Sequence, residues 1–496
     1  MSMKEKLSNC NNYGKLVILI GLLIACPLIV LPFYPEESKY ALAFLAPSII
    51  SVMLGAALCL KLKPSQNNLQ RLLTLQYGYL TVLFAWFYGF LAGAIPFVFS
   101  GQLNFVQALF ESVSGWTTTG LSVVDVTVLP HIFLFHRSYM QFLGGLGFVM
   151  IMIMFVQGKQ SMSLYSAEGH PDKLMPNLKN TARTIILMYL YYLLFGTIGY
   201  VIFGMNTFDS LLHAMSALST GGFSTKVDSI GAYNNLSIEV LTIVLMLIGT
   251  TNFAVLLMIT KRRFKKIKRV SEIRFMILII IIFVPILSLS LFNGIYSNFP
   301  ESIRVSLFNI ISALSTTGYS TVTYATWPEF SIGILILLML IGGGSGSTAG
   351  GIKLTRVYLL FRISIENIRK RIHPSRRVMQ PFYYKAQGKT PIDEELSSDI
   401  TGFISSYLFL FILGSMLLTI TTNSTLTEAM FEFASSLGTV GLSIGITGPA
   451  TTSITLIIQM IGMTLGRLEI FIVLIGFYSG VSLFRNKLKK HKLFMN

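Results

Sequence analysis

Charged residues are scarce in this chain of 496 residues. Asp, Glu, Lys and Arg together make up 12% of the sequence, whereas hydrophobic residues make up 53% and the mean hydropathy is +0.67. Soluble globular domains carry about 25% charged residues. This composition excludes a soluble globular protein and predicts an integral membrane protein.

Cysteine is also scarce. Cys10, Cys26 and Cys59 are scattered along the chain, and two of them lie in or beside apolar runs. Neither a disulfide framework nor a metal cluster is therefore indicated. We expect no covalent cofactor.

Acidic residues number 21 against 38 basic ones, so the net charge is +17. The basic residues cluster in segments 261–269, 369–377 and 485–492. The alternate connections carry only four, namely Lys39, Arg137, Lys226 and Arg304. This asymmetry follows the positive-inside rule and predicts that the basic loops and both termini are cytoplasmic, where the loops can also contact anionic lipid. Nucleic acid is not an expected partner, because no soluble domain combines basic residues with stacking aromatic residues.

Ten apolar runs are long enough, at about 20 residues, to cross a bilayer. They lie near residues 15–33, 40–62, 72–95, 137–157, 184–204, 236–260, 273–293, 329–360, 397–420 and 452–483, and Gly or Pro interrupts several of them. The first run follows Lys4, Lys6 and Lys15, as in a signal peptide. Because it is long, lacks a small-residue cleavage site and is followed at once by a second span, we expect it to be retained.

One short motif occurs four times between these runs: SGWTTTGLS at 114–122, SALSTGGFST at 216–225, SALSTTGYST at 312–321 and SSLGTVGLS at 435–443. The copies align without gaps on Gly120, Gly222, Gly318 and Gly441. In every copy Ser stands six residues before this glycine, Thr two before it and Ser two after it. Such a repeat predicts four structural units built alike.

Each motif follows a short segment that is too short to cross a bilayer. Several of these segments open with residues typical of helix starts, namely Asn104, Thr207 with Asp209, Pro300 with Glu301, and Thr425 with Glu428. We expect re-entrant half-helices, so that each unit reads helix, pore loop, helix. Non-helical backbone at membrane depth is tolerated only where protein buries it or it lines a watery cavity.

Four such loops around one axis would form a ring of oxygens that replaces the hydration shell of a monovalent cation. Glycine allows the required backbone dihedrals, and the carboxyl ends of the half-helices add partial negative charge. The residues expected to bind the ion are Thr118, Thr119, Gly120, Thr220, Gly221, Gly222, Thr316, Thr317, Gly318, Thr439, Val440 and Gly441. Close helix packing through small residues is the alternative, but it does not explain one register kept in four copies.

The units predict an all-α fold with two extra N-terminal helices. The expected boundaries are 1–70 for the two-helix segment, 71–160, 161–262 and 263–372 for units one to three, and 373–496 for unit four.

These motifs resemble those of the Trk/Ktr/HKT superfamily of potassium transporters, and most closely its bacterial Trk-type pore subunits. The resemblance includes FLGGLGF (142–148), GGGSGSTAGGIKLTR (342–356), IHPSRRV (372–378) and GRLEIF (466–471) and covers essentially the whole chain. It implies a pseudo-fourfold potassium pore in the bacterial cytoplasmic membrane, a homodimer, and gating by a ring of cytosolic nucleotide-binding (RCK-type) subunits. In this superfamily an intact first filter glycine, here Gly120, goes with potassium as the transported ion.

The glycine cluster at 342–351 should unwind the helix that begins near Ile332. Gly346 and Gly351 have the spacing of a phosphate-binding loop, but Ile352 separates Gly351 from Lys353 and an apolar span precedes the cluster, so nucleotide binding is not expected. The resemblance implies that this loop gates the pore. The expected gate residues are Gly343, Gly344, Ser345, Gly346, Ser347, Gly350, Gly351, Lys353 and Arg467.

Arg467 lies inside the last apolar run, where a charge is costly and usually functional. We expect it to point into the pore or to pair with oxygens of the 342–351 loop; a structural pair between units is the alternative. Lys353 either joins this barrier or extends to the cytoplasmic surface. Glu111 and Glu432, nine residues before a filter glycine, either brace the loops or attract cations, and bracing is favoured.

Passive potassium uptake needs no covalent chemistry, so the chain is not expected to be an enzyme. A proton- or sodium-coupled symporter is one alternative, and it would need a coupling carboxylate in a spanning helix, for which only Glu469 is a candidate. A membrane receptor or enzyme that holds a ligand at the glycine-rich loop is the other. It would need a soluble domain, for which the longest cytoplasmic connection, near 361–396, is too short.

Overall fold

The computed structural model describes residues 12–61, 74–147, 178–372, 381–479 and 481. The chain ends, Cys10, the basic segment 485–492 and much of the expected span 137–157 lie outside these residues.

Long apolar helices dominate the molecule, as expected from the composition. Within the described residues, six helices are long and apolar enough to cross a membrane: Tyr13–Val30, Pro35–Leu60, Tyr79–Phe99, Lys179–Ile202, Ser271–Phe292 and Glu394–Thr422. Their outward faces carry large apolar side chains such as Ile202, Ile281 and Phe409, each more than 60% exposed. Exposed apolar surface of this extent is typical of contact with lipid. The prediction of a helical membrane protein is confirmed.

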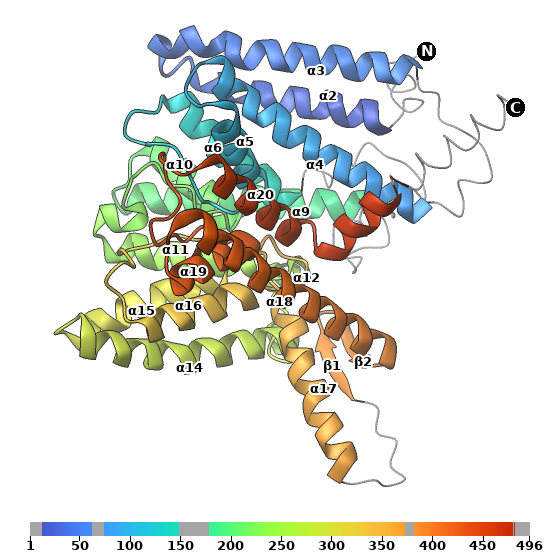
Figure 1. Cartoon of the computed structure of the whole chain (residues 1–496), viewed down its shortest axis with the longest axis vertical. Coiled ribbons are helices and arrows are strands. Elements are labelled where there is room, and N and C mark those ends of the chain that lie inside the picture. Colours follow the sequence, from blue (N-terminus) through green and yellow to red (C-terminus); the bar gives the residue numbers. More distant parts are fainter. Residues whose placement is uncertain (1–11, 62–73, 148–177, 373–380, 480, 482–496) are drawn as a thin grey trace, which may run out of the picture.

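The two N-terminal helices form a hairpin at one edge of the molecule (Figure 1). Helices α2 (Asn12–Ala25) and α3 (Ala41–Lys61) are joined through the short 3-10 helices η1 (Cys26–Val30) and η2 (Pro35–Tyr40). They pack so closely that a Cβ atom on Gly14 would lie 2.6 Å from Cys59 Sγ. Small residues permit such close approach between helices in lipid.

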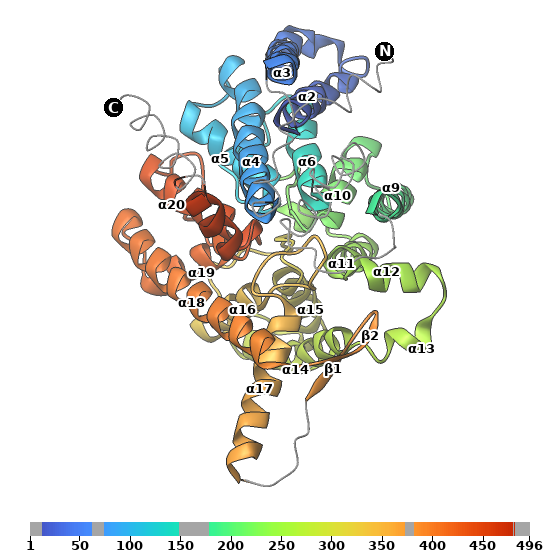
Figure 2. The same ribbon diagram turned by 90° about the vertical axis from the view of Figure 1, so that its right-hand side faces the viewer.

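Most of the remaining helices follow one pattern of three helices that occurs four times. A long helix comes first in each unit: α4 (Thr74–Phe99), α9 (Leu178–Ile202), α14 (Ser271–Gly294) and α18 (Glu394–Thr422). A half-helix follows: α5 (Phe105–Trp116), α10 (Thr207–Leu218), α15 (Phe299–Leu314) and α19 (Leu426–Leu437). The third is α6 (His131–Leu146), α11 (Leu236–Thr250), α16 (Glu329–Ile341) or α20 (Ser453–Arg467). Figure 2 shows the four units in chain order around a common centre.

The third helix of each unit stops short of a full span. Helix α11 bends by 115° into α12 (Phe253–Thr260), and α20 bends by 99° into the helix Ile470–Ser479. Helix α16 ends at Gly342, whose φ of 68° continues no helix, and α6 ends at Gly147, whose φ is 71°. The sequence predicted the break at Gly342. The runs 236–260 and 452–483, expected as spans, are also broken.

Two of the basic residues thought to mark the non-cytoplasmic connections lie in helices instead. Arg137 is 2% exposed inside α6, and its Nε donates to Glu111 Oε1 over 2.5 Å. Arg304 lies in α15 and makes two hydrogen bonds of 2.7 Å to Glu239. The assignment of Arg137 to a connection is wrong, because its charge is paired inside the protein.

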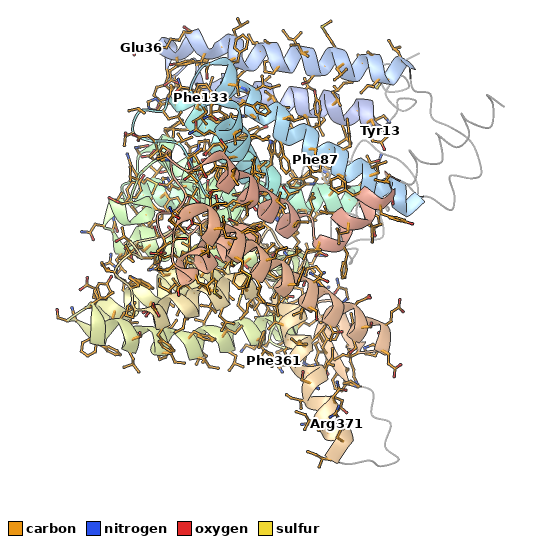
Figure 3. All side chains as sticks on the ribbon, viewed as in Figure 1. Tyr13, Glu36, Phe87, Phe133, Phe361 and Arg371 are labelled. Atoms are coloured by element: carbon orange, nitrogen blue, oxygen red, sulfur yellow. The ribbon has the colours of Figure 1, made fainter. Side chains whose placement is uncertain are left out.

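A short β-hairpin departs from the all-helical expectation. Strands β1 (Phe382–Lys385) and β2 (Gly388–Pro391) pair antiparallel between units three and four. The hairpin is fastened to the start of α14, because Tyr384 N donates to Ser271 Oγ over 3.0 Å. It follows α17 (Leu354–Ile372), which projects away from the helical body, with Phe361 at its base and Arg371 near its far end (Figure 3). The minor helices η4 (Ser229–Tyr233) and α13 (Phe264–Ile267) complete the described elements.

Candidate functional site: the loop ring and the glycine-rich segment

Three of the four half-helices begin with a polar side-chain cap. Asn104 and Thr425 form capping boxes with Gln107 and Glu428, as the sequence indicated. Helix α10 is capped by Asn206, whose side chain accepts from Asp209 N, rather than by the expected Thr207. Helix α15 begins after Asn298 without a side-chain cap. These caps satisfy backbone N–H groups that a helix start leaves free.

All four half-helices end in the same way. The residue before each filter glycine donates its N–H to the carbonyl of the motif serine, five residues earlier, over 2.8–3.0 Å: Thr119 to Ser114, Gly221 to Ser216, Thr317 to Ser312 and Val440 to Ser435. The preceding threonines donate to the carbonyls three residues earlier over 3.0–3.2 Å. This pair of bonds is the Schellman motif, in which the reversing residue is usually glycine.

Threonine occupies the reversing position here in all four copies. Thr118, Thr220, Thr316 and Thr439 have φ between 51° and 55°, in the left-handed region that β-branched residues rarely adopt. All four are fully buried. Strained backbone of this kind persists where the surroundings impose it, and it clusters at functional sites.

The four glycines meet one another in a closed ring. A Cβ atom built on each would collide with a carbonyl oxygen of the next unit: Gly120 with Gly221, Gly222 with Thr317, Gly318 with Val440, and Gly441 with Thr119. The carbonyl before each glycine therefore lies against the glycine of the preceding unit. Loops from four distant parts of the sequence converge, and only glycine fits the approach.

Side chains tie neighbouring loops together. Gln141 of α6 is fully buried and spans both sides of Gly222, because its Nε2 donates to Gly221 O over 2.6 Å and its Oε1 accepts from Phe223 N over 3.1 Å. Tyr319 of unit three donates to the carbonyls of His213 and Phe223 in unit two. Side-chain hydrogen bonds between units therefore hold the ring together, in addition to the close packing of its glycines.

The position nine residues before each glycine braces the chain after the filter. Glu111 and Glu432 are fully buried and accept hydrogen bonds from Ser122 and Ser443, two residues after the glycine. His213 lies 3.0 Å from Ser224 Oγ in unit two. Asn309 contacts Thr321, one residue further on, over 3.4 Å in unit three. The favoured bracing role of Glu111 and Glu432 agrees with these contacts.

The glycine-rich segment lies directly against three of the four filter threonines. Gly350 N donates to Thr316 Oγ1 over 2.8 Å, Thr348 Oγ1 lies 3.2 Å from Thr220 Oγ1, and a Cβ atom on Gly350 would collide with Thr439 Oγ1. The segment is also bonded to the end of α11, since Gly344 N donates to Thr250 O over 3.0 Å. Other groups of the protein therefore accept hydrogen bonds from the non-helical backbone of this segment.

Arg467 fastens this segment to unit one. Its Nη1 donates to Thr348 O over 2.6 Å, and its Nη2 donates to Gly144 O over 2.5 Å. The expected pairing with oxygens of the loop is thus present. Lys353, for which two positions were open, directs its Nζ to Ala349 O of the same segment.

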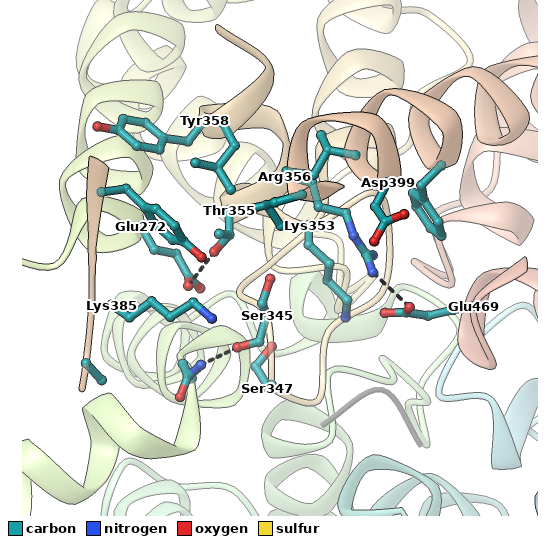
Figure 4. Close-up of a pocket in the computed structure, with 18 of the residues that line it drawn as sticks. Glu272, Ser345, Ser347, Lys353, Thr355, Arg356, Tyr358, Lys385, Asp399 and Glu469 are labelled. Carbon is teal, nitrogen blue, oxygen red and sulfur yellow. Dashed lines mark hydrogen bonds and ion pairs between the residues drawn. The ribbon is translucent and has the colours of Figure 1, made fainter. Parts of the chain in front are cut away.

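A cavity of about 750 Å³ is lined by residues of this segment and by none of the four motif threonines. Ser345, Ser347 and Lys353 line it, together with Arg356 and Lys385 (Figure 4). The arginine pairs with Glu469 over 2.8 Å, and Glu272 accepts from Thr355 over 2.8 Å. The segment therefore stands between the filter loops and this cavity.

Several residues of the site were not expected from the sequence. Gln141, Thr348 and Glu272 contact the loops or the glycine-rich segment, yet none was singled out. Gln141 carried a usable signal, because a polar side chain within an apolar run is often functional. Thr348 sits inside the quoted glycine cluster, but only the fold places its hydroxyl beside Thr220.

Comparisons with known proteins agree with this architecture. A family model named TrkH, cation transport protein, matches residues 43–482. The chain belongs to this family. It is 30% identical over 478 residues to the Trk system potassium uptake protein TrkH of Escherichia coli, with 94% of this chain and 96% of that protein covered. The Trk system potassium uptake protein TrkG of the same species is 32% identical over 481 residues, with the same coverage.

A solved structure matches the whole architecture. The potassium transporter TrkH from Vibrio parahaemolyticus superposes with a TM-score of 0.80 at 25% identity, and the match covers 96% of this chain and 98% of that one. The resemblance stated from the sequence is confirmed. The family comprises transport proteins rather than enzymes, as expected.

Replacing Arg137 by Met should destabilise unit one. The change leaves Glu111 buried without its cationic partner, and breaking a buried ion pair costs about 3–5 kcal/mol. We expect a lower melting temperature of the detergent-purified protein. The double variant Arg137→Met with Glu111→Gln should recover part of the loss, and equal melting temperatures for Arg137→Met and the parent would contradict a structural role for the pair.

Proposed function

We propose that this protein mediates potassium uptake across the bacterial cytoplasmic membrane through a filter built from its four loops. The observation that carries the proposal is the closed ring in which the carbonyls of Thr119, Gly221, Thr317 and Val440 each lie against a glycine of the neighbouring unit. Carbonyl rings bind monovalent cations in place of their hydration shell. The named relatives are potassium uptake proteins, which supports potassium as the substrate.

The glycine-rich segment is the proposed gate. It fills the space beneath three filter threonines and is held there by Arg467, whose positive charge would repel a passing cation. Lys353 adds a second charge on the same segment. Opening would require these contacts to break, so the described arrangement corresponds to a closed pore.

Uptake is proposed to follow the membrane potential without a coupled ion. Glu469, the only coupling candidate expected from the sequence, forms an ion pair with Arg356 over 2.8 Å, which favours a structural role for this carboxylate. Flux driven by a potassium gradient alone in liposomes supports this mechanism. Dependence on a proton or sodium gradient would favour the symporter, and nucleotide binding by the purified chain without any cation flux would favour a receptor or enzyme.

The filter proposal is tested at Gly120. A Cβ atom there would collide with Gly221 O, so Gly120→Ser must displace a carbonyl of the ring. We expect a several-fold loss of potassium preference over sodium, measured by ion competition in reconstituted flux. Gly204→Ser is the matched control, since Gly204 has a similar φ of 96° but nothing within 4 Å of its Cβ position. Unchanged selectivity in Gly120→Ser would count against the filter.

The gate proposal is tested at Arg467. Arg467→Gln removes the charge and at least one carbonyl contact, so potassium flux through the chain alone should rise above that of the parent. Arg274→Gln serves as the control, because Arg274 bonds to Lys268 O outside the glycine-rich segment. A folded Arg467→Gln variant with unchanged or reduced flux would contradict the proposal that this arginine holds the glycine-rich segment in its closed position.

We further propose that the chain forms a homodimer and that a cytosolic nucleotide-binding subunit regulates it from the cytoplasmic side. Helix α17 supports the dimer. Phe361, Ile365, Ile368 and Ile372 are 44–65% exposed along its projecting part. Their spacing of four, three and four residues is the heptad pattern that packs against another helix.

This dimer surface yields a direct prediction. Ile365→Lys with Ile368→Lys should shift the detergent-purified protein from dimer to monomer mass in light scattering, because two charges would be buried in the helix contact. Asn367→Lys, on another face of α17, should leave the mass unchanged. A dimer that persists in the double lysine variant would place the subunit contact elsewhere.

A further inference from the structure

Units one and four each carry a buried glutamate nine residues before the filter glycine. Only one of the two glutamates has a partner of opposite charge. Glu111 and Glu432 occupy equivalent positions and are both fully buried. Arg137 neutralises Glu111 over 2.5 Å. Within the described part of the chain, no Lys, Arg or His forms an ion pair with Glu432.

The neighbours of Glu432 are arranged to donate hydrogen bonds to it. Ile444 N donates to Oε2 over 3.2 Å, and Thr447 N donates to Oε1 over 3.1 Å. Ser443 Oγ accepts from Gly445 N, and this leaves the serine hydrogen for the carboxylate, over 2.9 Å to Oε1.

Thr447 is oriented in the same way. Its Oγ1 accepts from Gln459 Nε2 over 2.7 Å, so its own hydrogen points to Glu432 Oε1. Four donors converge on the two oxygens. An ionised carboxylate accepts on both oxygens, whereas a protonated one must use part of its capacity as a donor. The network therefore suits the charged form.

A buried carboxylate without a partner of opposite charge is strongly unfavourable, because hydrogen bonds replace only part of its hydration. A cation close by would supply the missing compensation. Ser443, which donates to the carboxylate, stands two residues after Gly441. Two residues of chain and one side chain place the carboxylate on the order of 10 Å from the filter glycine.

We propose that the cation held in the filter is the counter-ion of Glu432, and that this glutamate sets the apparent affinity of the pore for potassium. Unit one carries its own cation, so its glutamate adds no net field, whereas unit four contributes an uncompensated negative charge. The inference rests on the proposed filter function. It assigns Glu432 a positioning role through charge, since it does not touch the ion.

The test is the potassium dependence of reconstituted flux in Glu432→Gln. Glutamine keeps the size of the side chain and one oxygen acceptor but removes the charge. A unit charge at this separation and an effective dielectric constant of about 20 changes ion affinity by roughly tenfold. We expect the KM for potassium to rise by about that factor, with a smaller change in the maximal rate, and Glu432→Asp should restore most of the affinity.

A second variant tests the same claim by adding a positive charge instead of removing the negative one. Gln459→Lys places a cation next to Thr447, one hydroxyl away from Glu432, and so supplies the partner that Arg137 provides in unit one. The KM should rise here as well. Asp125→Asn is the control: this exposed acid lies five residues after Gly120, and salt screens its charge, so the KM should stay within about twofold of the parent.

The outcomes separate the two proposals. If Gly120→Ser alters selectivity while both Glu432→Gln and Gln459→Lys keep the parental KM and melting temperature, the filter stands and the counter-ion inference is wrong. A purely bracing role would lower the maximal rate, the selectivity or the melting temperature in Glu432→Gln and leave the KM unchanged. If Gly120→Ser leaves selectivity unchanged, the filter itself is refuted.

Discussion

The constraint on which the rest of the structure depends is that polar backbone inside a membrane must find partners within the protein. At the ends of the four half-helices, the chain meets this constraint by turning back through a left-handed threonine, which lets the next N–H bond to the motif serine carbonyl. Carbonyl groups of the half-helix thereby accept hydrogen bonds from these N–H groups. The carbonyls of Thr119, Gly221, Thr317 and Val440 then lie against the glycines of the neighbouring units, which leave room for them.

Hydrogen bonds join the filter loops to the glycine-rich segment. The hydroxyls of Thr316 and Thr220 contact Gly350 and Thr348, and Arg467 connects Thr348 to the end of α6. The ends of α6, α11 and α20 take part in these contacts through Gly144 O, Thr250 O and Arg467. Releasing the segment means breaking contacts with three units together. This cost is the physical basis of the proposal that the segment gates the pore.

Much of this arrangement could be predicted from the sequence, because four copies in one register report a shared backbone geometry directly. Arg467 could be predicted too, since a charge within an apolar run needs oxygens nearby. The bends after α11 and α20 could not, because no glycine cluster marks them. They depend on caps and contacts such as the hydrogen bond that Ala254 N donates to Asn252 Oδ1, which exist only in the folded protein. The hairpin at 382–391 could not be predicted, because its sequence pattern is too short to indicate strands. The contact of Gln141 could not be predicted either, because it is made to a loop 80 residues away in the sequence.

The most direct measurement is to locate the ion itself, by anomalous scattering from crystals of the protein soaked in rubidium or thallium, which substitute for potassium. The account predicts a peak at the centre of the four loops, coordinated by the carbonyl oxygens of Thr119, Gly221, Thr317 and Val440. A protein that conducts the same ion but shows its peak away from this ring would contradict the account.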